Sequence, residues 1–234
     1  MATTTIYADS SRGAVYNSGS DWEGVTTATS GSSVTTSASQ VYAVRGALVS
    51  GRGGSIYHDV RTFAYFDTSA ITTNITAATL KVHGNGSSGD GGTMYLYKGD
   101  AFGGAGGSDS LDTDDYDEWT NTTYSADSYS YLSWDNGGLN DFTINSTGIT
   151  AMNNNSELNT AFLSYQTIQG DEPTQSTAAL GINFYTSGSN RLKLVITHAD
   201  PAQGYTNEVI SVAAASISDV VGIETDEIEE VIGV

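Results

Sequence analysis

Short runs of alternating apolar and polar residues, separated by turn-forming residues, constrain the fold of this chain more than any other feature. The clearest run covers residues 56–66, and a second covers residues 41–49. A period of two residues places successive side chains on opposite faces of a β-strand. A Gly-rich segment at residues 51–54 lies between the two runs. We therefore predict two central strands joined by a turn.

The same pattern predicts an all-β protein along most of the chain. Thr, Tyr, Val and Ile favour strands, while 27 Gly and many Ser, Asn and Asp favour turns. Further strands are predicted at residues 3–7, 14–17, 78–83, 94–97, 141–144, 161–166, 179–185 and 192–198, with a helical turn at 147–153 and a loop or exposed edge at 30–39. About ten strands with long connections favour a jelly-roll β-sandwich over an up-and-down barrel. We expect this domain to cover residues 1–200, with a C-terminal tail at 201–234.

The charge of the chain limits its partners. Eight basic and 27 acidic residues give a formal net charge of -19. This charge repels nucleic acid and anionic membranes, so neither is an expected partner, and it suits an extracellular or particle-surface setting. With no cysteine, the chain has no disulfide and no thiolate metal site. The N-terminal residues lack the basic and apolar regions of a signal peptide, so we expect synthesis in the cytoplasm and release by lysis or by assembly into a particle.

The strand pattern is lost over residues 98–140, a segment rich in Gly and acidic residues. A connection of this length usually has a function or local structure of its own. Its aromatic residues could form a platform that stacks sugar rings, or they could pack the segment against the sandwich, which is the favoured interpretation. These residues are Trp119, Tyr124, Tyr129, Tyr131 and Trp134.

The same segment contains a run of carboxylates. Several oxygen ligands within ten residues suit Ca²⁺ better than a transition metal, and no other cofactor is expected. The spacing does not match an EF-hand loop, so a solvated acidic loop is the favoured alternative. The residues are Asp109, Asp112, Asp114, Asp115, Asp117 and Glu118.

No residue pattern predicts catalysis. The three histidines, His58, His83 and His198, lie within predicted strands, where a hydrogen-bonded structural role is the usual one. The chain has no Gly-x-Ser-x-Gly, His-Glu-x-x-His or phosphate-loop motif, and no carboxylate pair stands out as a glycosidase site. Arg61 and Arg191 lie in predicted strands, and each is expected to pair with a carboxylate. We expect a protein that is not an enzyme.

Two strand motifs resemble a known family. Residues 61–67 read Arg-Thr-Phe-Ala-Tyr-Phe-Asp, and residues 75–82 read Ile-Thr-Ala-Ala-Thr-Leu-Lys-Val. Their order and spacing resemble the DNRLRE or disaggregatase-related family of jelly-roll modules, and the resemblance extends over most of residues 41–198. It implies a carbohydrate-binding-like jelly roll of the kind found in surface proteins and in virion structural proteins of tailed bacteriophages.

The tail contains a repeat with a period of eleven residues. Residues 217–223, Ile-Ser-Asp-Val-Val-Gly-Ile, are matched by residues 228–234, and a degenerate copy covers residues 206–212. A helical supercoil and short turn-plus-strand units are both compatible with this period. The repeats form an apolar stripe of Val209, Ile210, Val212, Ile217, Val220, Val221, Ile223, Ile228, Val231, Ile232 and Val234.

A stripe on so short a segment needs a surface to cover it. We expect it to pack on other copies of the chain or on other virion proteins; the alternative is that it packs back on its own sandwich. The sequence thus predicts a bacteriophage virion structural protein on the particle exterior, a capsid decoration or a tail or fibre component. The alternative function is a standalone carbohydrate-binding module that contacts surface glycans, including those of a host.

Overall fold

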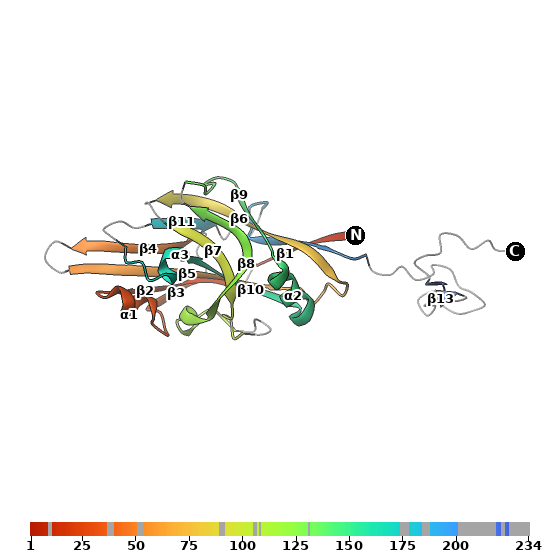
Figure 1. Ribbon diagram of the computed structural model, residues 1–234, viewed down its shortest axis with the longest axis horizontal. Helices are drawn as coiled ribbons and strands as arrows, with labels where there is room; N and C mark the ends of the chain where they lie inside the picture. The colour runs from red at the N-terminus through yellow and green to blue at the C-terminus, as the bar shows by residue number, and fades with distance from the viewer. Residues whose placement is uncertain are drawn as a thin grey trace.

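The structure, a computed structural model, describes residues 1–8, 11–36, 40–50, 54–88, 92–104, 107, 109–130, 132–173, 178–183, 188–200, 219–220 and 223–224. Over these residues the chain is mostly β, with few and short helices. Two antiparallel sheets, of four and six strands, pack face to face as a β-sandwich (Figure 1). The prediction of an all-β sandwich is thereby confirmed.

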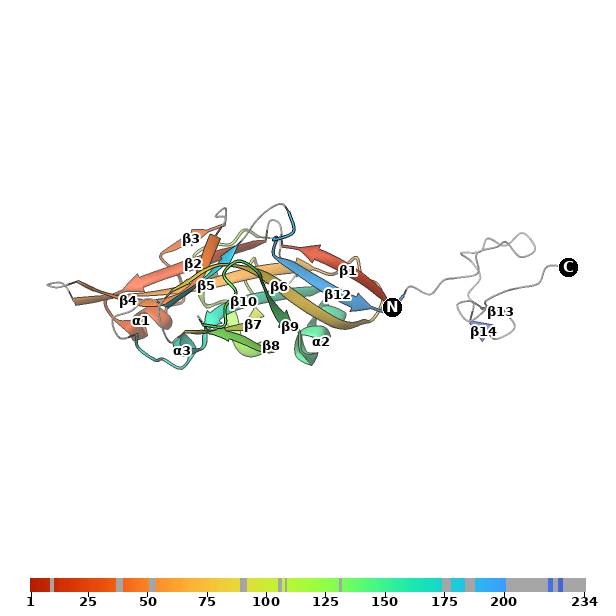
Figure 2. The ribbon, with the colours of Figure 1, turned by 90° about the horizontal axis from the view of Figure 1, so that it is seen from above.

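The four-stranded sheet contains the first strand of the chain. Its order is β1 (Ala2–Tyr7), β12 (Lys193–His198), β6 (Ile75–Ser88) and β9 (Leu139–Thr143). Leu80 in the centre of β6 lies opposite Leu194 on one side and Phe142 on the other. The first strand and the last strand of the sandwich are therefore neighbours, and they lie side by side in Figure 2.

The six-stranded sheet is organised around one long strand, β5. Its order is β11 (Ala178–Asn183), β4 (Gln40–Ser50), β5 (Gly54–Asp67), β10 (Glu157–Ser164), β7 (Thr93–Gly99) and β8 (Trp119–Ser130). The first half of β5 pairs with β4 and the second half with β10, while β2 (Arg12–Gly19) pairs along its other edge. β2 in turn pairs with the short strand β3 (Ser33–Thr35).

The strand β6 divides its edge in a similar way. Residues 75–81 pair with β12, and residues 84–88 pair with β11. The strands β11 and β12 follow each other in the sequence but do not form a hairpin, because each pairs with a different part of β6. This arrangement links the two sheets at one side of the sandwich.

Helices cover the ends of the strands. α2 (Ser146–Asn155) begins at Asn145, whose side-chain oxygen accepts hydrogen bonds from the amides of Thr147 and Gly148. Near its end, the Asn153 side chain accepts from the amide of Ile75 and donates to its carbonyl at 2.8 and 2.9 Å. These bonds hold the start of β6 against the helix. The shorter helices are α1 (Trp22–Thr26), α3 (Tyr165–Ile168) and the 3₁₀ turn η1 (Asp114–Asp117).

Strand alternation gives the larger sheet two buried faces. In β5, Ala64 and Phe66 point into the core between the sheets, whereas Phe63 and Tyr65 belong to a second cluster on the outer face. The second cluster is covered by the segment between β7 and β8, which contributes the buried residues Phe102, Leu111 and Tyr116. The chain therefore folds as a sandwich with one additional layer on the six-stranded sheet.

The strand β8 corrects the expectation that residues 98–140 are irregular throughout. It is a strand of 12 residues, Trp119–Ser130, that pairs with β7 with two shifts of register. Its sequence is rich in Thr, Ser and Tyr, so few apolar residues mark an alternation, although Thr and Tyr themselves favour strands. The aromatic residues at positions 119, 124 and 129 therefore lie in a strand and not in a long loop.

Candidate functional site

A buried ion pair forms the structural centre of the outer layer. Asp59 and Arg61 are two residues apart in β5, so both side chains point to the outer face of the sheet. The Nε of Arg61 donates to Asp59 at 3.0 Å, and each side chain is no more than 3% exposed. The pairing of Arg61 with a carboxylate is thus confirmed.

The remaining contacts of this pair connect four elements. Arg61 also donates to the backbone carbonyls of Tyr116 and Thr26, at 2.8 and 2.6 Å. Asp59 accepts from the hydroxyls of Tyr116 and Thr167, at 2.7 and 3.1 Å. Burial is the main reason that the pKa of Tyr116 is raised, so this phenol stays a donor. The network ties α1, η1 and α3 to β5.

The network forms part of the wall of a hollow of about 410 Å³. The hollow lies between α1, the start of β8 and the C-terminal end of α3, and both indoles of the outer layer, Trp22 and Trp119, line it. Arg61 and Thr167 of the network also line it, and both are buried. The full lining is Trp22, Glu23, Thr26, Thr27, Arg61, Trp119, Thr167, Ile168, Gln169 and Gly170.

Trp119 has a fixed orientation in this hollow. Its ring packs edge-on against Tyr97 with centroids 5.7 Å apart, and the guanidinium carbon of Arg61 lies 5.6 Å from its centroid. The same carbon lies 3.8 Å from the centroid of Tyr116. The indole is therefore held by an aromatic ring and a cation, and it still contributes to the lining of the hollow.

The other predicted aromatic residues do not join Trp119 in one platform. Tyr124 and Trp134 are 3% and 4% exposed and belong to the core between the sheets. Tyr129 is partly buried, packs against Trp134 and Phe142, and donates its hydroxyl to the carbonyl of Asp141. Packing is therefore the correct interpretation for these three side chains. Tyr131 lies outside the described residues.

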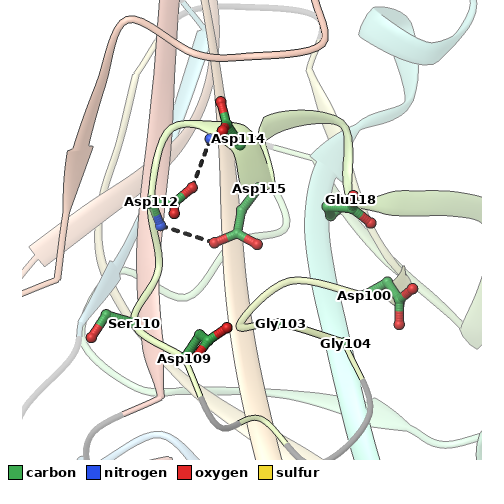
Figure 3. A pocket seen from close by; sticks show the side chains of 9 residues that line it. All are labelled: Asp100, Gly103, Gly104, Asp109, Ser110, Asp112, Asp114, Asp115 and Glu118. Atoms are coloured by element: carbon green, nitrogen blue, oxygen red, sulfur yellow. Dashed lines mark hydrogen bonds between the residues drawn. The ribbon is translucent and has the colours of Figure 1, made fainter.

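A second hollow, of about 360 Å³, is lined by carboxylates of the segment between β7 and β8 (Figure 3). Asp115 lies at its centre, where it accepts hydrogen bonds from the amides of Phe102 and Asp112 at 3.1 and 2.9 Å. Phe102 has a φ of 65°, an uncommon value for a residue with a side chain, and the Asp115 bond fixes this conformation. The lining residues are Asp100, Gly103, Gly104, Asp109, Ser110, Asp112, Asp114, Asp115 and Glu118.

The carboxylates of the acidic run do not all line this hollow. Over the residues that the structure describes, no three carboxylates or histidines come together as metal ligands. Asp115 is engaged with backbone amides, and Asp117 is absent from the lining of the hollow. Burial raises the pKa of both Asp115 and Glu118, and neighbouring carboxylates add to this effect. Asp115 therefore positions the backbone of its own segment, and Ca²⁺ binding by the acidic run stays a prediction.

The histidines lie in strands, as predicted. His58 is in β5, His83 in β6 and His198 in β12. His198 has hydrogen-bond contacts through its two ring nitrogens to the hydroxyls of Thr4 and Thr73, at 3.0 and 2.8 Å. It therefore links β1 to the segment before β6.

Most of the repeat stripe lies outside the described residues. Of its members, only Val220 and Ile223 are described, and only by their backbone: β13 (Asp219–Val220) pairs antiparallel with β14 (Ile223–Glu224), with Val220 opposite Ile223. Val209, Ile210, Val212, Ile217, Val221, Ile228, Val231, Ile232 and Val234 lie outside that part of the chain. No helix among the described residues has the length and apolar character needed to cross a membrane.

Several residues that line the hollow of about 410 Å³ are not predictable from the alternation pattern. Trp22, Glu23 and Thr26 lie in α1 and Gln169 directly follows α3, and the alternation pattern does not reveal such short helices. The available signal was the charged pair Asp59 and Arg61 within an otherwise apolar run, since charges on one face of a buried strand need partners from covering elements. No model of a known protein family matches the chain, and neither does any curated protein.

Proposed function

We propose that this protein is a structural component of a bacteriophage virion and not an enzyme. In this proposal it is displayed on the particle exterior, as a capsid decoration or as a tail or fibre component. Its partners are copies of itself and other virion proteins, bound through the C-terminal tail at residues 201–234. The proposal includes jelly-roll connectivity for the sandwich and membership of the resembled family of jelly-roll modules.

The observation that carries the proposal is the pairing of the tail strands. β13 and β14 form a two-stranded sheet of their own and extend neither sheet of the sandwich. The apolar repeats of the sequence are too short to bury themselves, so they need another surface to cover them. The tail follows β12, which lies beside β1, so it leaves the sandwich next to the N-terminal strand.

Two further features support an exposed position on a particle. The net charge of -19 opposes binding to packaged nucleic acid and favours solubility. The two motifs at residues 61–67 and 75–82 support the family resemblance, and they form the second half of β5 and the first half of β6. Both strands contribute to the core between the sheets.

Deletion of residues 201–234 tests the assembly role. Particles are produced with the full chain or with the truncated chain, purified, and analysed for the protein by quantitative mass spectrometry. We expect the truncated protein to fold but to be lost from purified particles. Undiminished incorporation would contradict a role of the tail in assembly, and absence of the full chain from all particles would contradict the virion function itself.

Carbohydrate binding is the second candidate function. The observation that favours it is the hollow at Trp119, where two indoles, three threonine hydroxyls, one side-chain amide and one carboxylate contribute to the lining. A glycan-binding screen of the purified full chain tests this function. Binding of one or more glycans is the expected result, and a screen without any bound glycan would contradict it.

A further inference from the structure

We infer that the hollow between α1, β8 and α3 binds an uncharged saccharide, with Trp119 as the stacking surface. This inference rests on carbohydrate binding, the second candidate function, and does not depend on the virion role. The volume of about 410 Å³ lies within the range of small-molecule sites, about 300 to 1,000 Å³. The hollow can therefore accept a small part of a glycan chain.

Trp119 provides a rigid apolar surface. Its contacts with Tyr97 and Arg61 hold the ring in place without burying it completely. The face of an aromatic ring carries negative charge density, which attracts the weakly positive C–H groups on one face of a pyranose ring. Because the indole is already ordered, stacking on it costs little conformational entropy.

Polar groups at the rim come from two different helices. Glu23 belongs to α1, whereas Gln169 directly follows α3, and both side chains are exposed. Neither the Glu23 carboxylate nor the Gln169 side-chain amide has a hydrogen-bond partner within the described parts of the chain. A carboxylate accepts hydrogen bonds, and an amide both donates and accepts them, which matches the mixed donor and acceptor character of sugar hydroxyls.

The charges around the hollow favour a neutral ligand over an acidic one. Arg61 is already paired with Asp59 and donates to two backbone carbonyls, so its charge is compensated. Glu23 is then the uncompensated charge in the lining, and the whole chain carries -19. An acidic polysaccharide would be repelled by both, whereas a neutral hexose chain would not.

The test is a titration of the full chain with cellobiose, maltose, lactose and diacetylchitobiose, followed by calorimetry and by tryptophan fluorescence. Two of the three tryptophans of the chain, Trp22 and Trp119, line the hollow, so binding should change the emission. We expect saturable binding of at least one disaccharide with Kd of about 1 mM. Glucuronate is the anionic probe and is not expected to bind. Choline is the competing cationic probe, because Glu23 and the indoles also suit a cation, and it is expected to bind more weakly than the disaccharide.

Variants of the lining identify the site. Trp119→Ala should weaken binding by about tenfold or more, and Gln169→Ala by about threefold. Tyr165→Ala is the matched control, because Tyr165 is an exposed aromatic residue of α3 that is not part of the lining. Its Kd should equal that of the unmodified chain. Because Trp119 also packs on Tyr97, circular dichroism checks that the Trp119→Ala variant is folded. If that variant is unfolded, the Gln169→Ala variant at the exposed rim tests the site.

Three results would overturn the inference. If none of the four disaccharides binds, the site proposed for a neutral saccharide is contradicted, whereas carbohydrate binding as a function is decided separately by the glycan-binding screen. If a disaccharide binds and neither the Trp119 nor the Gln169 variant weakens it, the function stands but the site is wrong. If choline or glucuronate binds in the disaccharide's place and depends on Trp119, the hollow is a site for a charged ligand.

Discussion

At the scale of single residues, the outer layer depends on the carboxylate of Asp59. This carboxylate accepts hydrogen bonds from Arg61, Tyr116 and Thr167, which belong to three different segments. A buried carboxylate has lost its hydrogen bonds to water, and these three donors offset the free-energy cost of that loss. Removal of one partner leaves the other charge buried and unpaired, and the resulting loss in the free energy of unfolding shows how much the fold depends on the pair.

Asp59→Asn should therefore destabilise the fold strongly. The substitution leaves the Arg61 guanidinium buried without a counter-charge, which costs about 3 kcal/mol in the free energy of unfolding. Chemical denaturation followed by circular dichroism measures this loss. The control is Lys81→Ala, because Lys81 pairs with Asp141 while their side chains are 27% and 45% exposed. That change should cost less than about 1 kcal/mol, and equal losses for both variants would contradict the role assigned to the buried pair.

Asp115 makes the folded chain less stable as the pH rises, whereas a carboxylate in a salt bridge makes it more stable. Burial raises its pKa in the folded chain, so the folded state retains a proton that the unfolded state releases. Its effect is absent at a pH below the ordinary aspartate pKa of about 3.9, and stability is lost as the pH rises from there through the raised pKa. Asp115→Asn should reduce this loss, as measured by urea midpoints between pH 3 and 7. If the urea midpoints of the unmodified chain and of the Asp115→Asn variant change in parallel with pH, Asp115 does not cause the loss of stability.

At the scale of elements, the packing of β6 against the loop before β9 determines one edge of the sandwich. Gly84 of β6 donates its amide to the carbonyl of Gly138 at 3.0 Å. A Cβ atom at Gly84 would lie 2.0 Å from the carbonyl oxygen of Asp135 and 2.7 Å from Nε1 of Trp134. The close approach of these two backbones therefore requires glycine.

Gly84→Ala should destabilise the chain by about 2 kcal/mol or more, because the loop must move away from β6. Thermal unfolding compares this variant with Gly137→Ala in the same loop, where an added Cβ would meet nothing within 4 Å. The Gly137 change should stay within about 0.5 kcal/mol of the unmodified chain. If the two variants unfold at the same temperature, the proposed contact between β6 and the loop is wrong.

Elements with a clear alternation were predictable from the sequence, and those without it were not. The central strand β5 was predicted within a few residues of its ends, since its apolar residues fill both faces of the sheet. The strand β8 was not predicted, because Thr and Ser dominate its sequence and its partner β7 supplies the pairing. The hollow was not predicted either, because it depends on contacts between α1, β8 and α3, which are far apart in the chain.

At the scale of the whole molecule, a sandwich that buries its own apolar residues is followed by a tail with an apolar repeat. The sandwich buries its own apolar residues between its sheets and beneath its outer layer. The repeats at residues 206–212, 217–223 and 228–234 place apolar residues at a period of eleven in a segment too short to bury them. We therefore propose that the chain self-associates through its tail.

The mass of the full chain in solution, measured by light scattering during size-exclusion chromatography, tests this claim most directly. We expect the full chain to have the mass of an oligomer and residues 1–200 to have the mass of a single chain. The variant Val220→Asp with Val231→Asp places charges in two repeats and should also give the mass of a single chain. A full chain that has the mass of one chain at every concentration, as residues 1–200 do, would contradict assembly through the tail.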